Sequence, residues 1–374
     1  MNLRHARAAR SWSQSRLIRE IEAYAARHAT AVASTASLNV YVSEWENGHR
    51  KVSEQYAAIL RSVLGMTNAE LFGDPDTAEP TQVDGYDALI QRIDAAHSVS
   101  GSLVDTMLRQ TELLRTVDRQ LGAAGIVDQM QAHLTTLSDA LAFAVLPSAR
   151  RPVARALAGA GTLAGWQALD VGAADRAWRH YETAKSAARD AGEPLYLAHA
   201  TGEQAYVLLD AGRPELAIEL VREARTSEGS RLSPRLKAWL LAAEAEMCAH
   251  VGREDETRRA LDLASAALPS GEDSRDEDMP SIFLNESHMA RWRGNALALI
   301  GQDEAVSQLQ SALDSIDPTF TRAQAGLRCD LAQAYAFRGE YGEAAVHIRE
   351  ARRLANRTGS IRHIRRIERI GRAF

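Results

Sequence analysis

The chain contains very little cysteine and lysine. Only two of its 374 residues are cysteines, Cys248 and Cys329, so no disulfide framework is available and a reduced, cytoplasmic location is expected. No apolar run approaches the roughly 20 residues that span a bilayer, and the N-terminus has no apolar signal segment, so no membrane partner is expected. Lysine occurs only at Lys51, Lys185 and Lys237, while alanine, glycine and arginine are abundant, a composition that suggests a GC-rich genome.

Motifs for catalysis and for metal binding are also missing. The chain has no phosphate-binding loop, no nucleophile elbow and no His-Glu-x-x-His motif. Its carboxylates are scattered over helical patterns, and its histidines are isolated rather than spaced as metal ligands. We therefore expect no enzyme activity, no cofactor and no metal site.

Charge is distributed unevenly along the chain. The formal net charge of −5 argues against a protein that coats nucleic acid along its whole length. Residues 1–73 nevertheless contain nine Lys/Arg against six Asp/Glu, and residues 361–374 contain five Arg against one Glu. Any contact with DNA is therefore expected near the ends of the chain.

Two motifs in residues 1–73 predict a helix-turn-helix, in which a second helix enters the DNA major groove. Ser13 is a good N-cap for the first helix, and Ser37 is a good N-cap for a recognition helix over residues 38–46. Val42 and Trp45 are three residues apart and should face inward. The expected DNA contacts come from the start of the first helix, the outer face of the second and the loop after it: Ser13, Gln14, Ser37, Asn39, Val40, Tyr41, Ser43, Glu44, Asn47, His49, Arg50 and Lys51.

The end of this first domain carries its own signals. Thr67 and Glu70 fit a capping box that opens a last short helix, and Gly73 fits its end. Residues 74–85 contain two prolines, a glycine and no periodicity, which predicts a linker. The expected domains are 1–73 (helix-turn-helix), 74–85 (linker), 86–155 (an intermediate helical segment, with an apolar stripe that includes Leu103 and Leu121) and 156–374 (repeats).

A repeated pattern begins near residue 156. Five glycines, spaced by 40, 40, 49 and 38 residues, each follow an apolar helical stretch and precede an amphipathic one: Gly172, Gly212, Gly252, Gly301 and Gly339. Small residues prevail five and twelve positions after each glycine, as close helix packing requires. The pattern predicts stacked helix pairs; an irregular helical bundle with coincidental glycines is the alternative.

The sequence resembles a known family over nearly its whole length. The segments Trp12-Ser13-Gln14 and Trp45-Glu46-Asn47-Gly48 are similar to those of the Cro/repressor-type (Xre) helix-turn-helix regulators, in a high-GC bacterial subtype that continues into tetratricopeptide-like repeats. About fourteen extra residues, 23–36, lengthen the region between the two motifs. Members often have basic residues where this chain has Asn39, Val40 and Glu44, which implies weaker or different DNA reading.

The resemblance also implies a binding groove inside the repeats, since the first helix of each pair lines the concave face. Arg291 and Asn295 share one helical face and resemble a clamp for a peptide carboxylate. Trp166 and Trp239 are also compatible with simple packing between repeats. In the family's repeat frame, the groove residues are Trp166, His199, Tyr206, Asp210, Trp239, Glu246, His250, His288, Arg291, Asn295 and Gln333.

The C-terminal run from Ile361 to Ile370 has isoleucine at every third position and arginine on its other faces. It predicts a capping or dimer-forming helix, with a basic surface that reaches phosphate as the alternative.

Together these features predict an all-α protein, a helix-turn-helix domain followed by a tetratricopeptide-like superhelix. The expected function is a sequence-specific transcriptional regulator, a homodimer on a double-stranded DNA operator, with a possible peptide or small-molecule effector. The alternative is a repeat scaffold for protein partners whose helix-turn-helix no longer binds DNA.

Overall fold

The computed structural model describes residues 3–28, 30–47, 50–67, 71, 85–227, 231–270, 276, 279, 281–282 and 284–372. All regular structure in these ranges is helical, which confirms the all-α prediction. Packing divides the chain into two compact units, Met1–Ile90 and Gln91–Phe374, and each is described here by itself. None of the described helices is long and apolar enough to cross a membrane.

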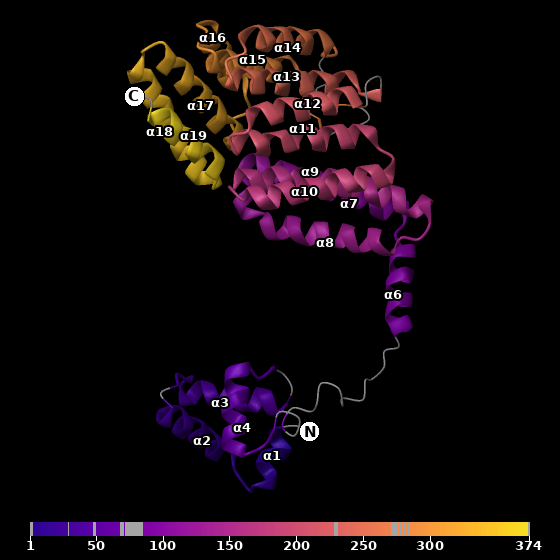
Figure 1. Ribbon diagram of the computed structural model, residues 1–374, viewed down its shortest axis with the longest axis vertical. Helices are drawn as coiled ribbons and strands as arrows, with labels where there is room; N and C mark the ends of the chain where they lie inside the picture. Colours follow the sequence, from indigo (N-terminus) through magenta and orange to yellow (C-terminus); the bar gives the residue numbers. More distant parts are fainter. Residues whose placement is uncertain are drawn as a thin grey trace. The chain divides into compact units, whose positions relative to one another are not determined.

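The N-terminal unit is a small bundle around one apolar core. Its helices are α1 (Leu3–Ala9), α2 (Gln14–Arg27), α3 (Thr35–Glu46) and α4 (Glu54–Leu64) (Figure 1). The core is built from Leu17 and Ile21 of α2, Val42 and Trp45 of α3, and Leu60 of α4, among others, all buried. The prediction that Val42 and Trp45 face inward is therefore confirmed.

The helix starts in this unit are set by serine caps. Ser13 caps α2 as predicted, and its hydroxyl accepts a hydrogen bond from the Arg16 amide at 3.1 Å. The prediction that Ser37 caps the next helix is wrong. Ser34 is the cap, because its hydroxyl accepts from the Ser37 amide at 3.3 Å, so α3 begins three residues earlier than expected.

Several predictions fall outside the described residues. Glu70 of the capping box, together with Phe72, Gly73, Gly48, His49 and residues 74–84 of the linker, belongs to this group. Gly85, the last residue of the expected linker, instead begins α6 (Gly85–His97), and the division between the two compact units falls inside that helix.

The C-terminal unit begins with helices that pack on the first repeat. These are α7 (Gly101–Leu121), a short 3-10 turn (Ala123–Gly125) and α8 (Val127–Phe143), and both α7 and α8 contact α9 (Pro147–Asp170). The predicted apolar stripe of this region is confirmed at Met107 and Leu114, which are buried, and is wrong at Leu103 and Leu121, which are exposed while Val104 is buried. Helix α9 crosses the expected boundary at residue 155, since Pro147 at its start is favourable in a first turn.

Five antiparallel helix pairs follow, stacked side by side (Figure 1). The pairs are α9 with α10 (Ala174–Ala191), α11 (Pro194–Asp210) with α12 (Pro214–Ser227), α13 (Pro234–His250) with α14 (Glu254–Ala267), α15 (Glu286–Leu299) with α16 (Glu304–Ser315), and α17 (Thr321–Phe337) with α18 (Tyr341–Thr358). The last helix is α19 (Ile361–Gly371). This is the tetratricopeptide-like array that the glycine spacing predicts.

The turn glycines have the backbone conformation that their position requires. All five adopt φ between +70° and +79°, a region that glycine enters without steric cost. The small residues that follow are buried between paired helices in four of the five pairs, as at Ala177 and Ala344. The prediction is displaced by one residue in the fourth pair, where Ala305 and Ala312 are buried instead of Val306 and Leu313.

The array closes on itself. Helix α19 contacts α9, and α17 and α18 contact α7, so the last repeat touches the first (Figure 1). Buried Asp118 of α7 pairs with Arg322 of α17, with 2.5 Å between carboxylate and guanidinium. The Ser360 hydroxyl donates to the Asp170 carboxylate at 2.6 Å. These polar contacts join residues that are far apart in the sequence and enclose a cavity between the first helices of the pairs.

Candidate functional site

The outer surface of α3 is the candidate DNA-reading surface. Asn39 and Val40 are exposed, with 54% of Val40 accessible, on the face opposite Val42 and Trp45. The Asn39 side-chain amide donates to the Thr35 carbonyl at 2.9 Å, an internal bond that a base would have to replace. Ser43 and Glu44 are half-buried beside them.

Tyr41 does not face outward as predicted. It is half-buried in an aromatic cluster, with its ring centroid 5.8 Å from that of Trp45 and 6.4 Å from that of Tyr56. Arg50 lies over its outer face at 3.9 Å and pairs with Glu44 at 3.4 Å. Exposed Arg50 and Lys51 thus remain beside α3, with Arg50 oriented by Tyr41.

Gln14 and Glu46, two residues of the motifs, are joined inside the unit. The Gln14 amide donates to a Glu46 carboxylate oxygen at 2.8 Å, and Arg7 donates to both oxygens at 2.5 and 3.0 Å. Burial alone would raise the pKa of Glu46, but hydrogen bonds from Arg7 and Gln14 outweigh it and lower that pKa. The Gln14 side chain, one of the predicted DNA contacts, is held by Glu46 and fixes α2 against α3.

The remaining predicted contacts lie around the ends of these helices. Ser13 is exposed at the start of α2, and Ser37 lies in the first turn of α3. Asn47 is the C-cap of α3, where its side-chain amide donates to the Ser43 carbonyl at 2.8 Å. Contact of any of these residues with DNA stays a prediction.

The second candidate site is the cavity of the repeat unit, with a volume of about 570 Å³. Helices α9, α11, α13, α15 and α17 supply most of its wall, and α7 and α19 complete it. All eleven groove residues expected from the repeat frame line this one cavity: Trp166, His199, Tyr206, Asp210, Trp239, Glu246, His250, His288, Arg291, Asn295 and Gln333. Ligand binding by them stays a prediction.

One wall of the cavity is aromatic. Trp166 packs edge-on against Tyr206 with ring centroids 6.2 Å apart, and Tyr206 lies 6.4 Å from Trp292. Trp239 continues the series at 6.0 Å from Trp292 and 5.1 Å from the His199 ring. Trp166 and Trp239 therefore have both of the roles considered from the sequence: they pack between repeats, and they border the cavity.

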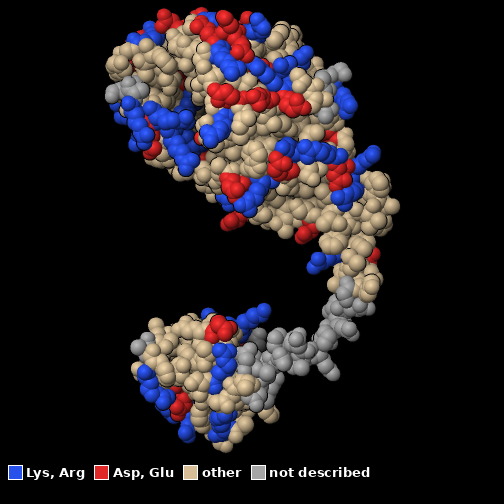
Figure 2. All heavy atoms as spheres, viewed as in Figure 1, with Lys and Arg blue, Asp and Glu red and all other residues tan. Residues whose placement is uncertain are grey.

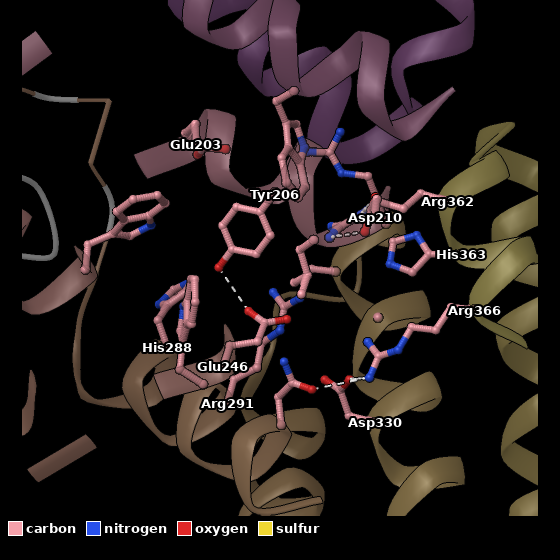
Figure 3. A pocket seen from close by; sticks show the side chains of 18 of the residues that line it. Glu203, Tyr206, Asp210, Glu246, His288, Arg291, Asp330, Arg362, His363 and Arg366 are labelled. Carbon is pink, nitrogen blue, oxygen red and sulfur yellow. Dashed lines mark hydrogen bonds and ion pairs between the residues drawn. The ribbon is translucent and has the colours of Figure 1, made fainter. Parts of the chain in front are cut away.

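Charged side chains adjoin this aromatic wall, where Arg362 lies over the rings of Trp166 and Tyr206 at 5.1 and 5.4 Å. Most of these charges are paired (Figure 3). Arg362 of α19 donates to both oxygens of Asp210 at 2.7 and 3.2 Å. Arg366 pairs with Asp330 at 2.5 Å and donates to the Asn295 side-chain oxygen at 3.2 Å. The Tyr206 hydroxyl donates to Glu246 at 2.9 Å.

Burial controls the protonation of several of these groups. Burial raises the pKa of Asp330, against the opposing effect of Arg366 and Arg291. Burial and then the charge of Arg291 lower the pKa of His288 to about 4, and burial and Arg362 lower that of His363 further below its usual value. Both histidines are therefore neutral near pH 7, and the cavity wall carries seven arginines against five carboxylates.

Sequence reasoning missed part of this wall. Leu163, Glu203, Trp292 and Asp330 each lie nine residues before a turn glycine, so one further position of the repeat frame could have found them. Arg362, His363, Arg366 and Arg369 could not be found in this way, because they reach the cavity only when α19 folds back onto the array.

The C-terminal helix packs on the array, and its arginines divide between the cavity and the outer surface. Ile367 and Ile370 are buried against the array, as a cap requires, but one arginine face lines the cavity rather than solvent. Other arginines of α18 and α19 do form an exposed basic surface (Figure 2), to which Arg349, Arg352, Arg357, Arg365 and Arg372 contribute.

Among the residues that the structure describes, no cluster of His, Cys, Asp and Glu could hold a metal ion. Cys248 and Cys329 are both buried and free.

No family model matches the chain, and no curated protein matches it. A Rap protein complexed with competence and sporulation factor is similar over 92% of this chain and 97% of that one, with 14% identity and a TM-score of 0.45. The kinesin light chain TPR-like repeats of Podosopora anserina are similar over 53% of this chain and 94% of that one, with 16% identity and a TM-score of 0.34. Both are helical repeat proteins, at identities too low to transfer a binding partner.

Proposed function

We propose that the protein is a sequence-specific DNA-binding transcriptional regulator whose repeat cavity binds an effector, either a peptide or a small molecule. The observation that supports DNA binding is the division of α3 into two faces. Val42 and Trp45 anchor one face in the core, while Asn39 and Val40 present an amide and a methyl surface to solvent. An asparagine amide can bond adenine at two points, and a valine can contact a thymine methyl.

Cations for the DNA backbone surround this helix. Arg16 is exposed in the first turn of α2, and Arg50 and Lys51 are exposed after α3. Cations near a groove-reading helix supply the sequence-independent part of the affinity, which falls as salt releases the bound counterions. A homodimer on a two-fold operator would place two such helices in successive major grooves.

One observation favours a second function. Helix α3 carries no Lys or Arg, and its accessible face includes Glu44, so it lacks the positive charge with which many DNA-reading helices attract phosphate. A repeat scaffold for protein partners, whose N-terminal unit no longer binds DNA, would have this character.

A salt titration on random double-stranded DNA separates the two functions. For the regulator, affinity measured by fluorescence anisotropy falls steeply as salt rises; for the scaffold, no binding is measured even at low salt. The double variant Arg50→Ala, Lys51→Ala should weaken binding to all sequences alike and reduce the salt slope by roughly two contacts. Arg176→Ala with Arg179→Ala, two exposed cations of α10, is the matched control and should change nothing.

Sequence preference is tested at Asn39. In a selection from random operators, Asn39→Ala should relax the preference at one base position by about 1–3 kcal/mol, while backbone affinity stays unchanged. Unchanged preference and unchanged affinity in both experiments would show that α3 does not lie on DNA.

A further inference from the structure

The cavity has the dimensions of a small-molecule site. Its volume of about 570 Å³ lies within the range of about 300–1,000 Å³ that is typical for such sites. Contacts of α7 with α17 and of α9 with α19 join the two ends of the array into a ring around it. A peptide of six residues in extended form spans about 20 Å, whereas a small organic molecule fits within this volume.

One cation in the cavity lacks a counterion. Arg291 of α15 lines the cavity and has no hydrogen bond or ion pair to any part of the chain that the structure describes. Its neighbours Asp330 and Glu246 influence it only through their charge, because Asp330 is paired with Arg366 and Glu246 accepts from Tyr206 (Figure 3).

Such an arginine is an expensive group to bury. Burial lowers the pKa of Arg291, but a guanidinium does not lose its proton in proteins, so the charge remains. Arg291 is half-buried, and a charge that has lost part of its hydration is destabilising unless an opposite charge and hydrogen bonds compensate it. A carboxylate or phosphate, which a guanidinium binds at two points, supplies both.

A flat apolar surface adjoins this cation. Trp292 follows Arg291 directly in α15 and belongs to the aromatic series formed with Tyr206 and Trp239, with ring centroids 6.4 and 6.0 Å from that of Trp292. Aromatic walls bind flat apolar groups through burial and edge-to-face contacts. Arg291 and the aromatic wall therefore border the same cavity.

We propose that the effector is a small organic anion with a flat, aromatic body, whose carboxylate or phosphate binds Arg291 and whose ring packs against Trp292 and its aromatic neighbours. This assignment names the chemical class of the proposed effector. Only an effect of the bound anion on DNA binding rests on the proposed regulator function; anion binding in the cavity does not.

Calorimetric titration of the full chain tests the assignment with three probes: 3-phenylpropionate, phenyl phosphate and the neutral 3-phenylpropanamide. The anions should bind saturably at millimolar concentration or below, and the amide roughly tenfold more weakly or not at all, because a hydrogen bond to a charged group is lost. The ratio between the two anions decides between carboxylate and phosphate.

Arg291→Met should weaken the binding of both anions about tenfold or more and leave the amide unchanged. Arg291→Lys should restore part of the anion affinity, and Arg352→Met, which removes an exposed arginine of α18, is the matched control. Arg291→Met should fold, since it removes an uncompensated charge, and its melting temperature should equal or exceed that of the wild type. The comparison of acid with amide in the wild type is independent of any variant.

Three results would overturn the proposal: no saturable binding of either anion, equal binding of acid and amide, or unchanged anion binding by Arg291→Met. Binding of an extended acidic hexapeptide without binding of either small anion would also overturn it, in favour of a peptide ligand. The DNA titration is a separate measurement, so loss of DNA binding with retained anion binding would refute only the regulator.

Discussion

Replacement of Glu46 by Ala is the most informative perturbation of the N-terminal unit. Glu46 belongs to the Trp-Glu-Asn-Gly motif, yet only 4% of it is exposed, and it accepts hydrogen bonds from Arg7 and Gln14. The variant leaves a partly buried Arg7 and a Gln14 amide without their acceptor. Its main effect should therefore be on folding of this unit, with any loss of DNA binding a consequence.

The magnitude follows from burial. Removal of one partner of a fully buried pair costs about 3–5 kcal/mol, and the 15% exposure of the Arg7 side chain places this pair near the lower limit, about 3 kcal/mol. For a domain of 60–100 residues, 1 kcal/mol shifts the melting temperature by about 4–8 °C, so the expected decrease is about 12–24 °C.

Differential scanning calorimetry of the full chain should show this decrease in the transition of the N-terminal unit alone. Glu44→Ala is the matched control, because Glu44 is half-exposed and pairs only at the surface, and it should cost less than about 1 kcal/mol. In a double-mutant cycle with Arg7→Ala, the decreases in the free energy of unfolding from the two single changes should sum to more than the decrease in the double variant. A decrease of only a few degrees, or additive losses, would show that the pair does not hold α1 and α2 against α3.

The pH dependence of Glu46 supplies an independent check. Because the pKa of Glu46 is lowered in the folded state, its contribution is present above the unfolded pKa of about 4.5 and is lost as the pH falls through the folded pKa. The difference in free energy of unfolding between the wild type and Glu46→Ala should therefore shrink on acidification, as measured by urea unfolding from pH 7 to pH 3.

Three further predictions concern the repeat unit. His288 has a folded pKa of about 4 against 6.5 unfolded, so stability should fall as the pH decreases through this interval, by at most ~1.4 kcal/mol per unit, and His288→Gln should remove that part of the slope in urea unfolding. Asp118→Asn should destabilise the unit by about 3 kcal/mol because it leaves Arg322 buried without its partner, and Arg322→Met in the same chain should recover most of the loss; no recovery would contradict pairing across the closure. Gly172→Ala should lower the melting temperature more than Gly339→Ala, because both have positive φ but only the first would place a Cβ 2.8 Å from Ile361, and equal losses would argue against closure of the array.

Local patterns determined much of the architecture. The turn glycines, the serine cap of α2 and the inward side of α3 follow from short-range rules, because helix periodicity and backbone conformation depend on residues only a few positions apart. The same periodicity, applied in a repeat frame, brought together eleven residues that line one cavity. It failed where Ser34 and Ser37, three residues apart, could each cap a helix, and where the small residues of the fourth pair are displaced by one position.

What remained undetermined in the sequence were the contacts between distant segments. Nothing near Glu46 indicates that Arg7 and Gln14 will surround it, and nothing in the isoleucine run after Ile361 indicates that Arg362 and Arg366 will meet Asp210 and Asp330. Periodicity shows which side of a helix is apolar, but closure of the array decides which polar side chains are removed from water and paired. The cavity, its charges and the unpaired Arg291 are therefore products of the tertiary structure, because desolvation and ion pairing depend on spatial neighbours and not on position along the chain.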